Sequence, residues 1–293
     1  MSLTKIKNPG TVLAVASPVF YSIFNASLKI ASNDISVFGL LFLRGLSGML
    51  LAVVVFRLAK IRPVINNLGL LIGVGIITAL ASVSVTMTIT LIPLYQAVVL
   101  LYLYPAFSVI LSMFIVKDRI TLLGLAGVLT AFAGCILLVW PDQKAGLELS
   151  AGHALGILGA FLYALGFVMT RKLGQAHSGL EPFFAFCLAG VLISWPLSAV
   201  LGSGLGIDSP REVCFGLAVV STGSLAQLMA FAALKYLPAF KVGVIGTMEV
   251  LGGSLASWFL FSDPFTVRTV IGAIIVLYAA FGFRAKEPKI AAA

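Results

Sequence analysis

Charged side chains are scarce in this chain. Only 10% of its 293 residues are Asp, Glu, Lys or Arg, whereas 60% are hydrophobic. Water-soluble domains carry about 25% charged residues. So few charges cannot cover the surface of a soluble enzyme, and so apolar a chain does not remain disordered in water. We therefore expect the lipid bilayer to surround most of the protein.

Cysteine and histidine are also rare. The three cysteines, Cys135, Cys187 and Cys214, fall in or beside apolar runs, so we interpret them as small buried hydrophobic residues and not as a disulfide framework or a metal site. The sequence contains no phosphate-binding loop, no His-Glu-x-x-His pair and no Cys/His metal spacing. These absences predict no cofactor, no bound metal and no enzyme activity.

Extended basic surfaces are missing as well. The net charge is +9, but Lys and Arg occur in twos and threes between apolar runs, which argues against nucleic acid as a partner.

A helix needs about 20 residues to cross about 30 Å of hydrocarbon. Apolar runs of that length predict ten membrane-spanning helices, because a count of nine needs one very long helix broken at Pro93. Their expected ranges are 10–31, 36–57, 68–90, 94–116, 120–140, 152–173, 182–202, 213–234, 239–261 and 265–283.

Lysines and arginines indicate the orientation of these helices. Of the 19, fourteen lie in segments on the side of the N-terminus, four lie on the opposite side, and Arg44 lies within a span. Cytoplasmic loops are enriched in positive residues. We therefore expect a multi-pass protein of the inner (plasma) membrane with both termini in the cytoplasm. The first span is too long for the core of a signal peptide, so we expect it to remain as a membrane helix.

Two parts of the chain resemble each other. A shift of 145 residues aligns identical residues between 88–127 and 233–272, and a shift of 142 aligns the first span with the sixth, including Tyr21 with Tyr163. The identities at the larger shift include Pro93/Pro238, Ser112/Ser257, Phe114/Phe259, Asp118/Asp263, Thr121/Thr266 and Gly127/Gly272. We therefore divide the chain into a first repeat (1–140), a linker (141–151), a second repeat (152–285) and a cytoplasmic tail (286–293).

Each repeat contains five predicted helices. Five is an odd number, so the second repeat enters the membrane from the side opposite to the first. Inverted repeats are typical of secondary transporters, in which two similar halves enclose a site near the midplane and open it to either side in turn. The sequence therefore predicts an all-α membrane protein with ten transmembrane helices, arranged as two inverted five-helix repeats around a central cavity.

Two stretches carry a resemblance to a known family. They run from Leu91-Ile92-Pro93 to Lys117-Asp118-Arg119-Ile120-Thr121, and from Ala233-Leu234-Lys235-Tyr236-Leu237-Pro238-Ala239 to Ser262-Asp263-Pro264. The chain resembles the EamA-type exporters of the drug/metabolite transporter superfamily, including the aromatic amino-acid exporter group. In that family a Tyr-x-Pro-Ala-like turn precedes a helix and an acidic residue; the first copy here lacks the Tyr and has Asp118 where Glu is frequent. The resemblance implies a secondary carrier that exports small metabolites.

Ionisable side chains within the spans mark candidate sites, because they cost about 2.5–3.5 kcal/mol at a helix centre on insertion scales. Glu249 lies about ten residues, or about 15 Å, along its span from Ala239. It is a candidate for binding substrate or a coupling proton; the alternative is a structural role beside Arg44 or a hydroxyl. Arg44 offers a planar fork for a carboxylate, and its alternatives are snorkelling and pairing with backbone carbonyls.

The repeat also filters the polar and aromatic positions, because a pseudo-twofold axis brings equivalent residues around one cavity. It selects three pairs: Tyr21 with Tyr163, Ser82 with Gln227, and Tyr104 with Glu249. Four nearby polar or aromatic residues complete the candidate substrate-binding set: Asn25, Thr86, Tyr95 and Tyr102. For each tyrosine, packing or a place at the membrane interface is the alternative. As a set, these residues suit an uncharged or zwitterionic solute with an apolar side chain.

The predicted function is export of small molecules by alternating access. Neutral or aromatic amino acids are the favoured substrates. Drug-like solutes are the alternative substrates. A passive channel is a further alternative, although the sequence offers no ring of charges for a filter. A serine protease is disfavoured because Ser47 of Gly45-Leu46-Ser47-Gly48 needs a base, and His153 and His177 fall at span ends or in loops. Close glycine spacings, such as Gly69/Gly73 and Gly152/Gly156, predict close helix packing.

Overall fold

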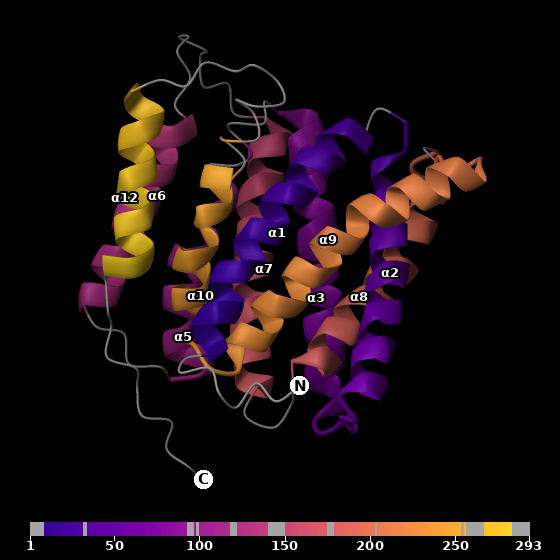
Figure 1. Ribbon diagram of the computed structural model, residues 1–293, viewed down its shortest axis with the longest axis horizontal. Helices are drawn as coiled ribbons and strands as arrows, with labels where there is room; N and C mark the ends of the chain where they lie inside the picture. Colours follow the sequence, from indigo (N-terminus) through magenta and orange to yellow (C-terminus); the bar gives the residue numbers. More distant parts are fainter. Residues whose placement is uncertain are drawn as a thin grey trace.

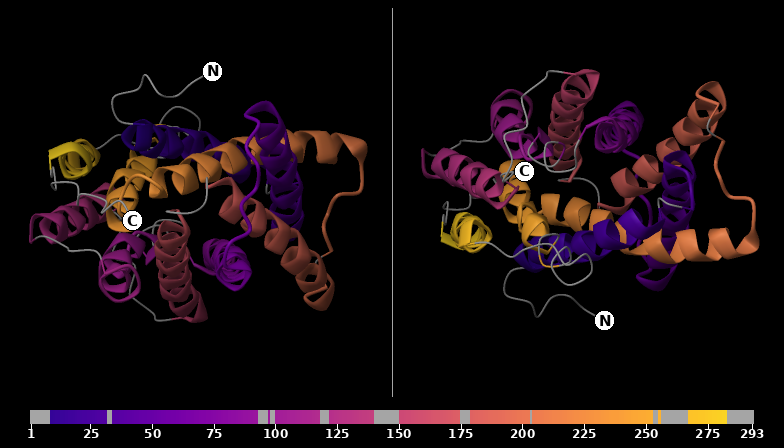
Figure 2. Two further views of the ribbon diagram at one scale, coloured as in Figure 1. Left: turned by 90° about the horizontal axis from the view of Figure 1, so that it is seen from below. Right: turned by 90° about the horizontal axis from the view of Figure 1, so that it is seen from above.

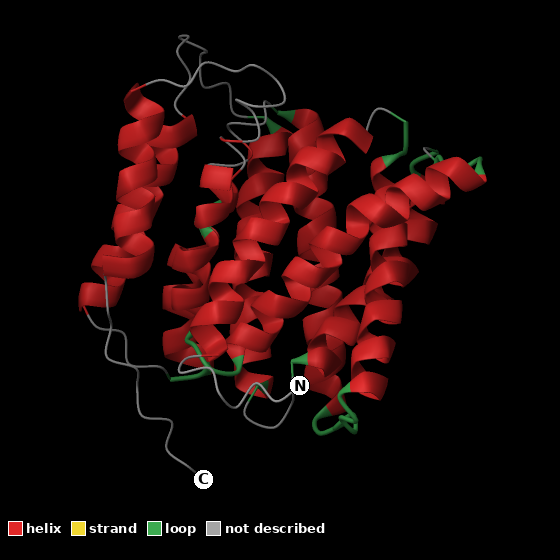
Figure 3. Ribbon diagram, in the orientation of Figure 1, coloured by secondary structure: helices red, strands yellow, loops and turns green. Residues whose placement is uncertain are grey.

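The protein is all-helical where its structure is described. The computed structural model describes residues 9–31, 34–92, 97, 100–117, 122–139, 150–174, 179–202, 204–252, 255 and 267–282. Within these ranges the chain forms ten α-helices and no β-strand (Figures 1 and 3). The helices are α1 (Pro9–Ala31), α2 (Val37–Leu58), α3 (Leu68–Leu91), α5 (Tyr104–Ile115), α6 (Leu122–Val139), α7 (Ala151–Leu173), α8 (Leu180–Val200), α9 (Pro210–Leu234), α10 (Ala239–Gly246) and α12 (Val267–Gly282).

The long helices have the length and composition of membrane spans. Six of them, α1, α2, α3, α7, α8 and α9, are long and apolar enough to cross a bilayer. Side chains cap free N-terminal amides: Ser36 Oγ accepts a hydrogen bond from Gly39 N at the start of α2, and Ser209 and Glu212 form a reciprocal capping box at the start of α9. Such caps define where these spans begin.

Helix pairing follows the internal repeat. The most extensive contacts join α1 to α9, α3 to α7, α2 to α8 and α6 to α12. Exchanging α1, α2, α3, α5 and α6 for α7, α8, α9, α10 and α12 leaves this set of pairs unchanged, which is the signature of a pseudo-twofold axis. In Figure 1, α1 runs upward whereas its equivalent α7 runs downward. The predicted fold of two inverted repeats is therefore confirmed.

The bundle has two long sides that face each other. End-on views place α1 and α9 along one side and α3, α5 and α7 along the other (Figure 2). The pair α2 and α8 lies towards one end, and the pair α6 and α12 lies at the opposite end. Each long side therefore contains helices from both copies.

Glycines set the closest approaches between helices. A Cβ atom on Gly45 of α2 would lie 2.7 Å from the carbonyl oxygen of Cys187 on α8, and one on Gly75 of α3 would lie 2.6 Å from that of Ala185. Gly152 and Gly156 of α7 also contact a neighbouring segment, as predicted. Close packing at Gly69 is a wrong prediction, since no atom of the described residues lies within 4 Å of the place that a Cβ would take there.

Two of the predicted spans are interrupted at equivalent positions. The range 94–116 was expected to form one helix, but a turn at Tyr102 and Leu103 precedes α5; Pro105, which has no amide hydrogen to donate, sits in the first turn of that helix. The range 239–261 was likewise expected to be continuous, but α10 ends at Gly246 and a turn at Thr247 separates it from residues 248–252. Thr247 is the repeat equivalent of Tyr102.

One cysteine differs from expectation. Cys135 and Cys187 are buried, as predicted. Cys214 is exposed, because it lies in the first turns of α9 on the outside of the bundle. Its prediction as a buried residue was wrong, since an apolar sequence neighbourhood does not distinguish the protein interior from a surface that faces lipid.

Replacing glycine by alanine should have different effects on stability at the closely packed and the open glycine positions of α3. Gly75→Ala introduces a Cβ against the α8 backbone, and we expect the free energy of unfolding to fall by about 1–3 kcal/mol, as in overpacked cores. Gly69→Ala is the matched control, because its Cβ meets no described atom and its stability should be unchanged or slightly higher. Unfolding in mixed micelles measures both; equal effects would contradict the packing described here.

Candidate functional site

Arg44 is a buried cation in the middle of α2. Its side chain is only 6% exposed, so it does not snorkel to a membrane surface. The guanidinium lies 4.9 Å from the ring centroid of Phe24, 5.6 Å from that of Phe186 and 5.7 Å from that of Tyr21. These distances are typical of cation–π contacts, which stabilise a charge that has left water.

The hydrogen bonds of Arg44 go to neutral oxygen atoms in the described part of the chain. Arg44 Nη2 donates to Tyr21 Oη at 3.0 Å, to Gln227 Oε1 at 3.4 Å and to the Gly223 carbonyl at 3.5 Å. Arg44 Nε is buried and has no hydrogen-bond partner among those same residues. The alternative of pairing with backbone carbonyls therefore accounts for only part of the group's environment.

Gln227 of α9 connects Arg44 to α1. Its side chain is fully buried, and Tyr21 Oη donates a hydrogen bond to Gln227 Oε1. Because an arginine only donates, the oxygen of the Gln227 amide must face Arg44. Gln227 Nε2 consequently points elsewhere, and no residue in the described ranges accepts a hydrogen bond from it.

A polar stripe on α1 reaches Glu249. Ser17, Tyr21 and Asn25 are spaced by four residues and therefore lie on one face of the helix. Ser17 Oγ donates to the Ala226 carbonyl at 2.9 Å, and Asn25 Nδ2 donates to Glu249 Oε1 at 2.6 Å. The only acidic side chain of the predicted set thus binds an amide, and not Arg44 or a hydroxyl.

Equivalent residues on the other long side also contact one another. The hydroxyl groups of Ser82 on α3 and Tyr163 on α7 are 3.1 Å apart. The ring centroid of Tyr104 on α5 lies 5.7 Å from that of Phe167 on α7, and Tyr104 Oη donates to the Gly243 carbonyl at 3.0 Å. Members of the three repeat pairs therefore make equivalent contacts within each long side: Tyr21 with Gln227 on one, and Ser82 with Tyr163 on the other.

Thr86 and Tyr102 lie beside this network. Thr86 Oγ1 donates to the Ser82 carbonyl on its own helix, at 2.7 Å. Tyr102 is buried in a cluster with Cys135, Val250 and Val276, and its ring centroid lies 6.5 Å from that of Tyr104. Tyr95 lies outside the described residues.

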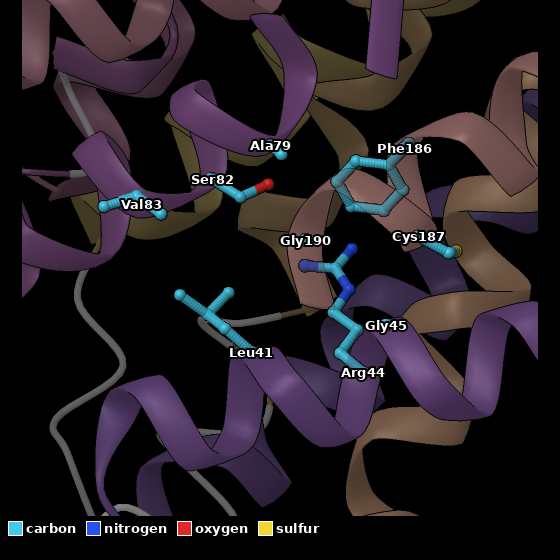
Figure 4. A pocket seen from close by; sticks show the side chains of 9 residues that line it. All are labelled: Leu41, Arg44, Gly45, Ala79, Ser82, Val83, Phe186, Cys187 and Gly190. Carbon is cyan, nitrogen blue, oxygen red and sulfur yellow. The ribbon is translucent and has the colours of Figure 1, made fainter. Parts of the chain in front are cut away.

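A hollow opens beside Arg44 between α2, α3 and α8. The centre of a water molecule has about 10 Å³ in which to lie there, so the hollow has room for about one water molecule in this conformation. Figure 4 shows the Arg44 side chain directed towards Ser82 and the Phe186 ring. Within the described residues, no three His, Cys, Asp or Glu side chains gather as a metal site would require. The groups that Arg44, Ser82 and Phe186 present at the hollow are a positive charge, a hydroxyl and an aromatic ring.

Several residues of the site were missed from the sequence. Phe24 and Phe186 contact the guanidinium. The Ser47 and Ser224 hydroxyls lie 3.0 Å apart, and both are within hydrogen-bond distance of the Arg44 carbonyl, so this cluster holds α2 against α9. The four-residue spacing on α1 was a usable signal for Ser17. The shift of 142 residues was a usable signal for Phe186, because it aligns that residue with Arg44.

Comparison with known proteins assigns the fold to a family. The model of the EamA-like transporter family matches residues 8–140 and 150–284, which is nearly the whole chain in two copies. The chain belongs to the EamA-like transporter family. Membership shows a membrane transporter of small molecules and no enzyme, as predicted.

Relatives of this EamA-like transporter carry different substrates. It is 25% identical to the pseudopaline exporter CntI of Pseudomonas aeruginosa (strain UCBPP-PA14) over 92% of this chain and 94% of the relative. It is 24% identical to the S-adenosylmethionine uptake transporter of Rickettsia prowazekii (strain Madrid E) over 74% of this chain and 70% of the relative. One relative is named for export and the other for uptake, and neither is named for aromatic amino acids.

A solved structure has the same fold. The similarity to one crystal structure has a TM-score of 0.73 and covers 92% of this chain and 94% of the other, at 19% sequence identity. At that identity the likeness concerns the fold alone.

The two equivalent tyrosines should differ in their contribution to stability. Tyr21→Phe removes an acceptor from the buried Arg44, and we expect it to lower the free energy of unfolding by about 1.5–3 kcal/mol, the usual range for a bond to a charged group. Tyr163→Phe removes a bond between neutral hydroxyls, for which about 0.5–1.5 kcal/mol is expected. Unfolding of both variants in mixed micelles measures the difference. Equal losses would show that Arg44 does not depend on the Tyr21 hydroxyl.

Proposed function

We propose that this transporter is a secondary carrier that exports small metabolites by alternating access, with neutral amino acids bearing aromatic or bulky side chains as its principal substrates. The observation that carries the proposal is the helix pairing, which is preserved when the two copies are exchanged. Two similar halves that enclose one central site can rock about it and expose it to either side.

The interrupted helices support the same mechanism. The turns at Tyr102 and Thr247 lie at equivalent positions of the two copies. Discontinuous helices at the midplane of transporters expose backbone groups and allow the two parts of a helix to move separately. A pair of such turns gives each half its own hinge.

The substrate class follows from the lining of the site. Arg44 and Glu249 are the charged groups of the candidate set; tyrosine and phenylalanine rings surround Arg44, and Asn25 donates a hydrogen bond to Glu249. One charge of each sign among aromatic rings suits a zwitterion with an apolar side chain. The exporter among the relatives matches 92% of this chain, and its match supports export as the direction.

Counterflow in proteoliposomes tests this function. Vesicles preloaded with unlabelled phenylalanine should accumulate labelled phenylalanine transiently and with saturation, because a carrier exchanges its substrate across the membrane. Empty vesicles with the same protein are the control for trans-stimulation. A linear, unsaturable flux without trans-stimulation would indicate a channel. If a drug-like cation competes with labelled phenylalanine and no amino acid does, the substrates belong to the alternative, drug-like class.

We also propose a domain organisation and an orientation. The two repeats occupy 1–140 and 152–285 and are joined by 141–151, and 286–293 form a cytoplasmic tail. The protein lies in the inner (plasma) membrane with both termini in the cytoplasm. Fourteen of the 19 lysines and arginines support this orientation. The α2–α3 loop is then cytoplasmic and the α8–α9 loop external.

Accessibility of single cysteines measures that orientation. In a chain without its native cysteines, we expect Asp208→Cys to react with an impermeant maleimide on intact cells, because position 208 is exposed in the α8–α9 loop. Arg62→Cys, exposed in the α2–α3 loop, should react only after permeabilisation. The reverse pattern would place both termini outside the cell.

A further inference from the structure

The two long sides of the bundle carry different chemistry at equivalent positions. On the side of α1 and α9, four polar side chains face the site, and we call them the polar wall: Tyr21, Asn25, Gln227 and Glu249. Their equivalents at shifts of 142 and 145 residues form what we call the aromatic wall: Tyr163, Phe167, Ser82 and Tyr104. Figure 2 shows these sides across the bundle from each other.

Contacts on the two walls follow the same equivalence. The hydrogen bond from Tyr21 to Gln227 corresponds to the contact between Tyr163 and Ser82. The hydrogen bond from Asn25 to Glu249 corresponds to the ring contact between Phe167 and Tyr104. The pairs are therefore retained in both copies, and only their polarity differs.

Arg44 on α2 and Phe186 on α8 lie next to both walls, because Arg44 bonds to Tyr21 and Gln227 and both residues line a hollow with Ser82. They are equivalent residues at the shift of 142, and the guanidinium lies 5.6 Å from the Phe186 ring centroid. Phe186 also packs on Phe231, which contacts Phe167. A chain of contacts between buried rings thus links the cation to Phe167 of the aromatic wall.

Two buried donors at this point have no acceptor within the described residues. Arg44 Nε and Gln227 Nε2 belong to side chains that are 6% and 0% exposed, and neither atom has a hydrogen-bond partner there. The two side chains touch, since Arg44 Nη2 lies 3.4 Å from Gln227 Oε1. A buried donor without an acceptor is destabilising, and more so when it is charged. An anionic ligand group that accepts from these donors would remove that cost.

We propose that the substrate is a zwitterion whose carboxylate binds to Arg44 and Gln227, whose ammonium group binds to Glu249, and whose apolar side chain lies against the aromatic wall. This inference rests on the proposed function and specifies the substrate class and its orientation. A carboxylate matches the edge of a guanidinium because its two oxygens accept two parallel hydrogen bonds.

The spacing along α1 fits the two charged ends of such a head group. Tyr21 contacts Arg44, and Asn25, one helical turn further on, contacts Glu249. One turn rises about 5.4 Å, so the cation and the carboxylate act on the same face of α1 at the separation of neighbouring turns. An amine without a carboxylate leaves Arg44 uncompensated, so the site discriminates against it.

The sharpest test gives Arg44 a counter-ion of its own. Gln227→Glu keeps the shape of the side chain and an oxygen that accepts from Tyr21 and Arg44, while it replaces the unpartnered donor by an anionic oxygen. The variant should remain folded, with an unfolding temperature at or above that of the parent protein. A substrate carboxylate would then compete with a resident one, so its binding should weaken at least about tenfold, a change of about 1.4 kcal/mol.

Four related probes separate the parts of the head group: phenylalanine, 3-phenylpropionate without the amine, and phenylalaninamide and phenethylamine without the carboxylate. Equilibrium binding to the full-length purified protein measures each of them. We expect the parent protein to bind phenylalanine at least about tenfold more tightly than phenylalaninamide, and Gln227→Glu to abolish that preference. Glu249→Gln should instead weaken the binding of phenylalanine while leaving the affinity for 3-phenylpropionate unchanged.

Tyr163→Phe is the matched control, because it removes the equivalent hydroxyl of the aromatic wall and leaves Arg44 untouched. It should change the affinities for phenylalanine and phenylalaninamide by the same factor. Equal binding of these two probes to the parent protein, an unchanged preference in Gln227→Glu, or no binding of any carboxylate would overturn the inference. Counterflow tests the proposed function separately. If the protein prefers phenylalanine to phenylalaninamide but shows no trans-stimulation, the carrier function is wrong and the binding site is supported. If it shows counterflow without that preference, the carrier function is supported and the binding site is wrong.

Discussion

The buried guanidinium of Arg44 is the constraint on which the centre of this protein depends. A cation in an apolar interior is tolerated only when its surroundings replace the water it has lost. Here three aromatic rings and three neutral oxygens do so, drawn from α1, α8 and α9 around the α2 residue. Because those four helices must meet at one residue, the charge specifies their relative positions as well as the chemistry of the site.

Duplication explains how four helices from two halves of the chain come to that point. Contacts such as α1 with α9 and α3 with α7 exchange when the copies exchange, so each half completes the other and neither copy has its full set of contacts alone. Small residues allow α2 and α8, the pair towards one end of the bundle, to approach closely: there is no room for a Cβ at Gly45 of α2 beside the Cys187 carbonyl of α8. Arg44 and Phe186 lie on the same two helices, so the candidate site is at the point where α2 and α8 pack closely.

The sequence predicted the fold to a greater depth than it predicted the site. Apolar runs and the two shifts were sufficient for the helices, their pairing into copies and their inversion, because lipid imposes a length and a repeat imposes a symmetry. They were insufficient for the turns at Tyr102 and Thr247, which depend on local hydrogen bonds, and for Cys214, whose apolar neighbours fit lipid and core equally well. Among site residues, Tyr21, Gln227 and Arg44 were found because they are polar in an apolar setting, whereas Phe24 and Phe167 resemble every other apolar residue until their partners are known.

The difference between the two walls is the clearest consequence of inversion for chemistry. A symmetric cavity built from identical copies would present the same groups to both ends of a ligand, and a ligand with one charged end would bind it equally well in two orientations. Replacement of Asn25 and Glu249 by Phe167 and Tyr104 at the equivalent positions removes that degeneracy without changing which residues touch. The scaffold can therefore keep the symmetry that the proposed alternating access requires, while a few side chains supply the polarity that the proposed recognition of a zwitterion requires.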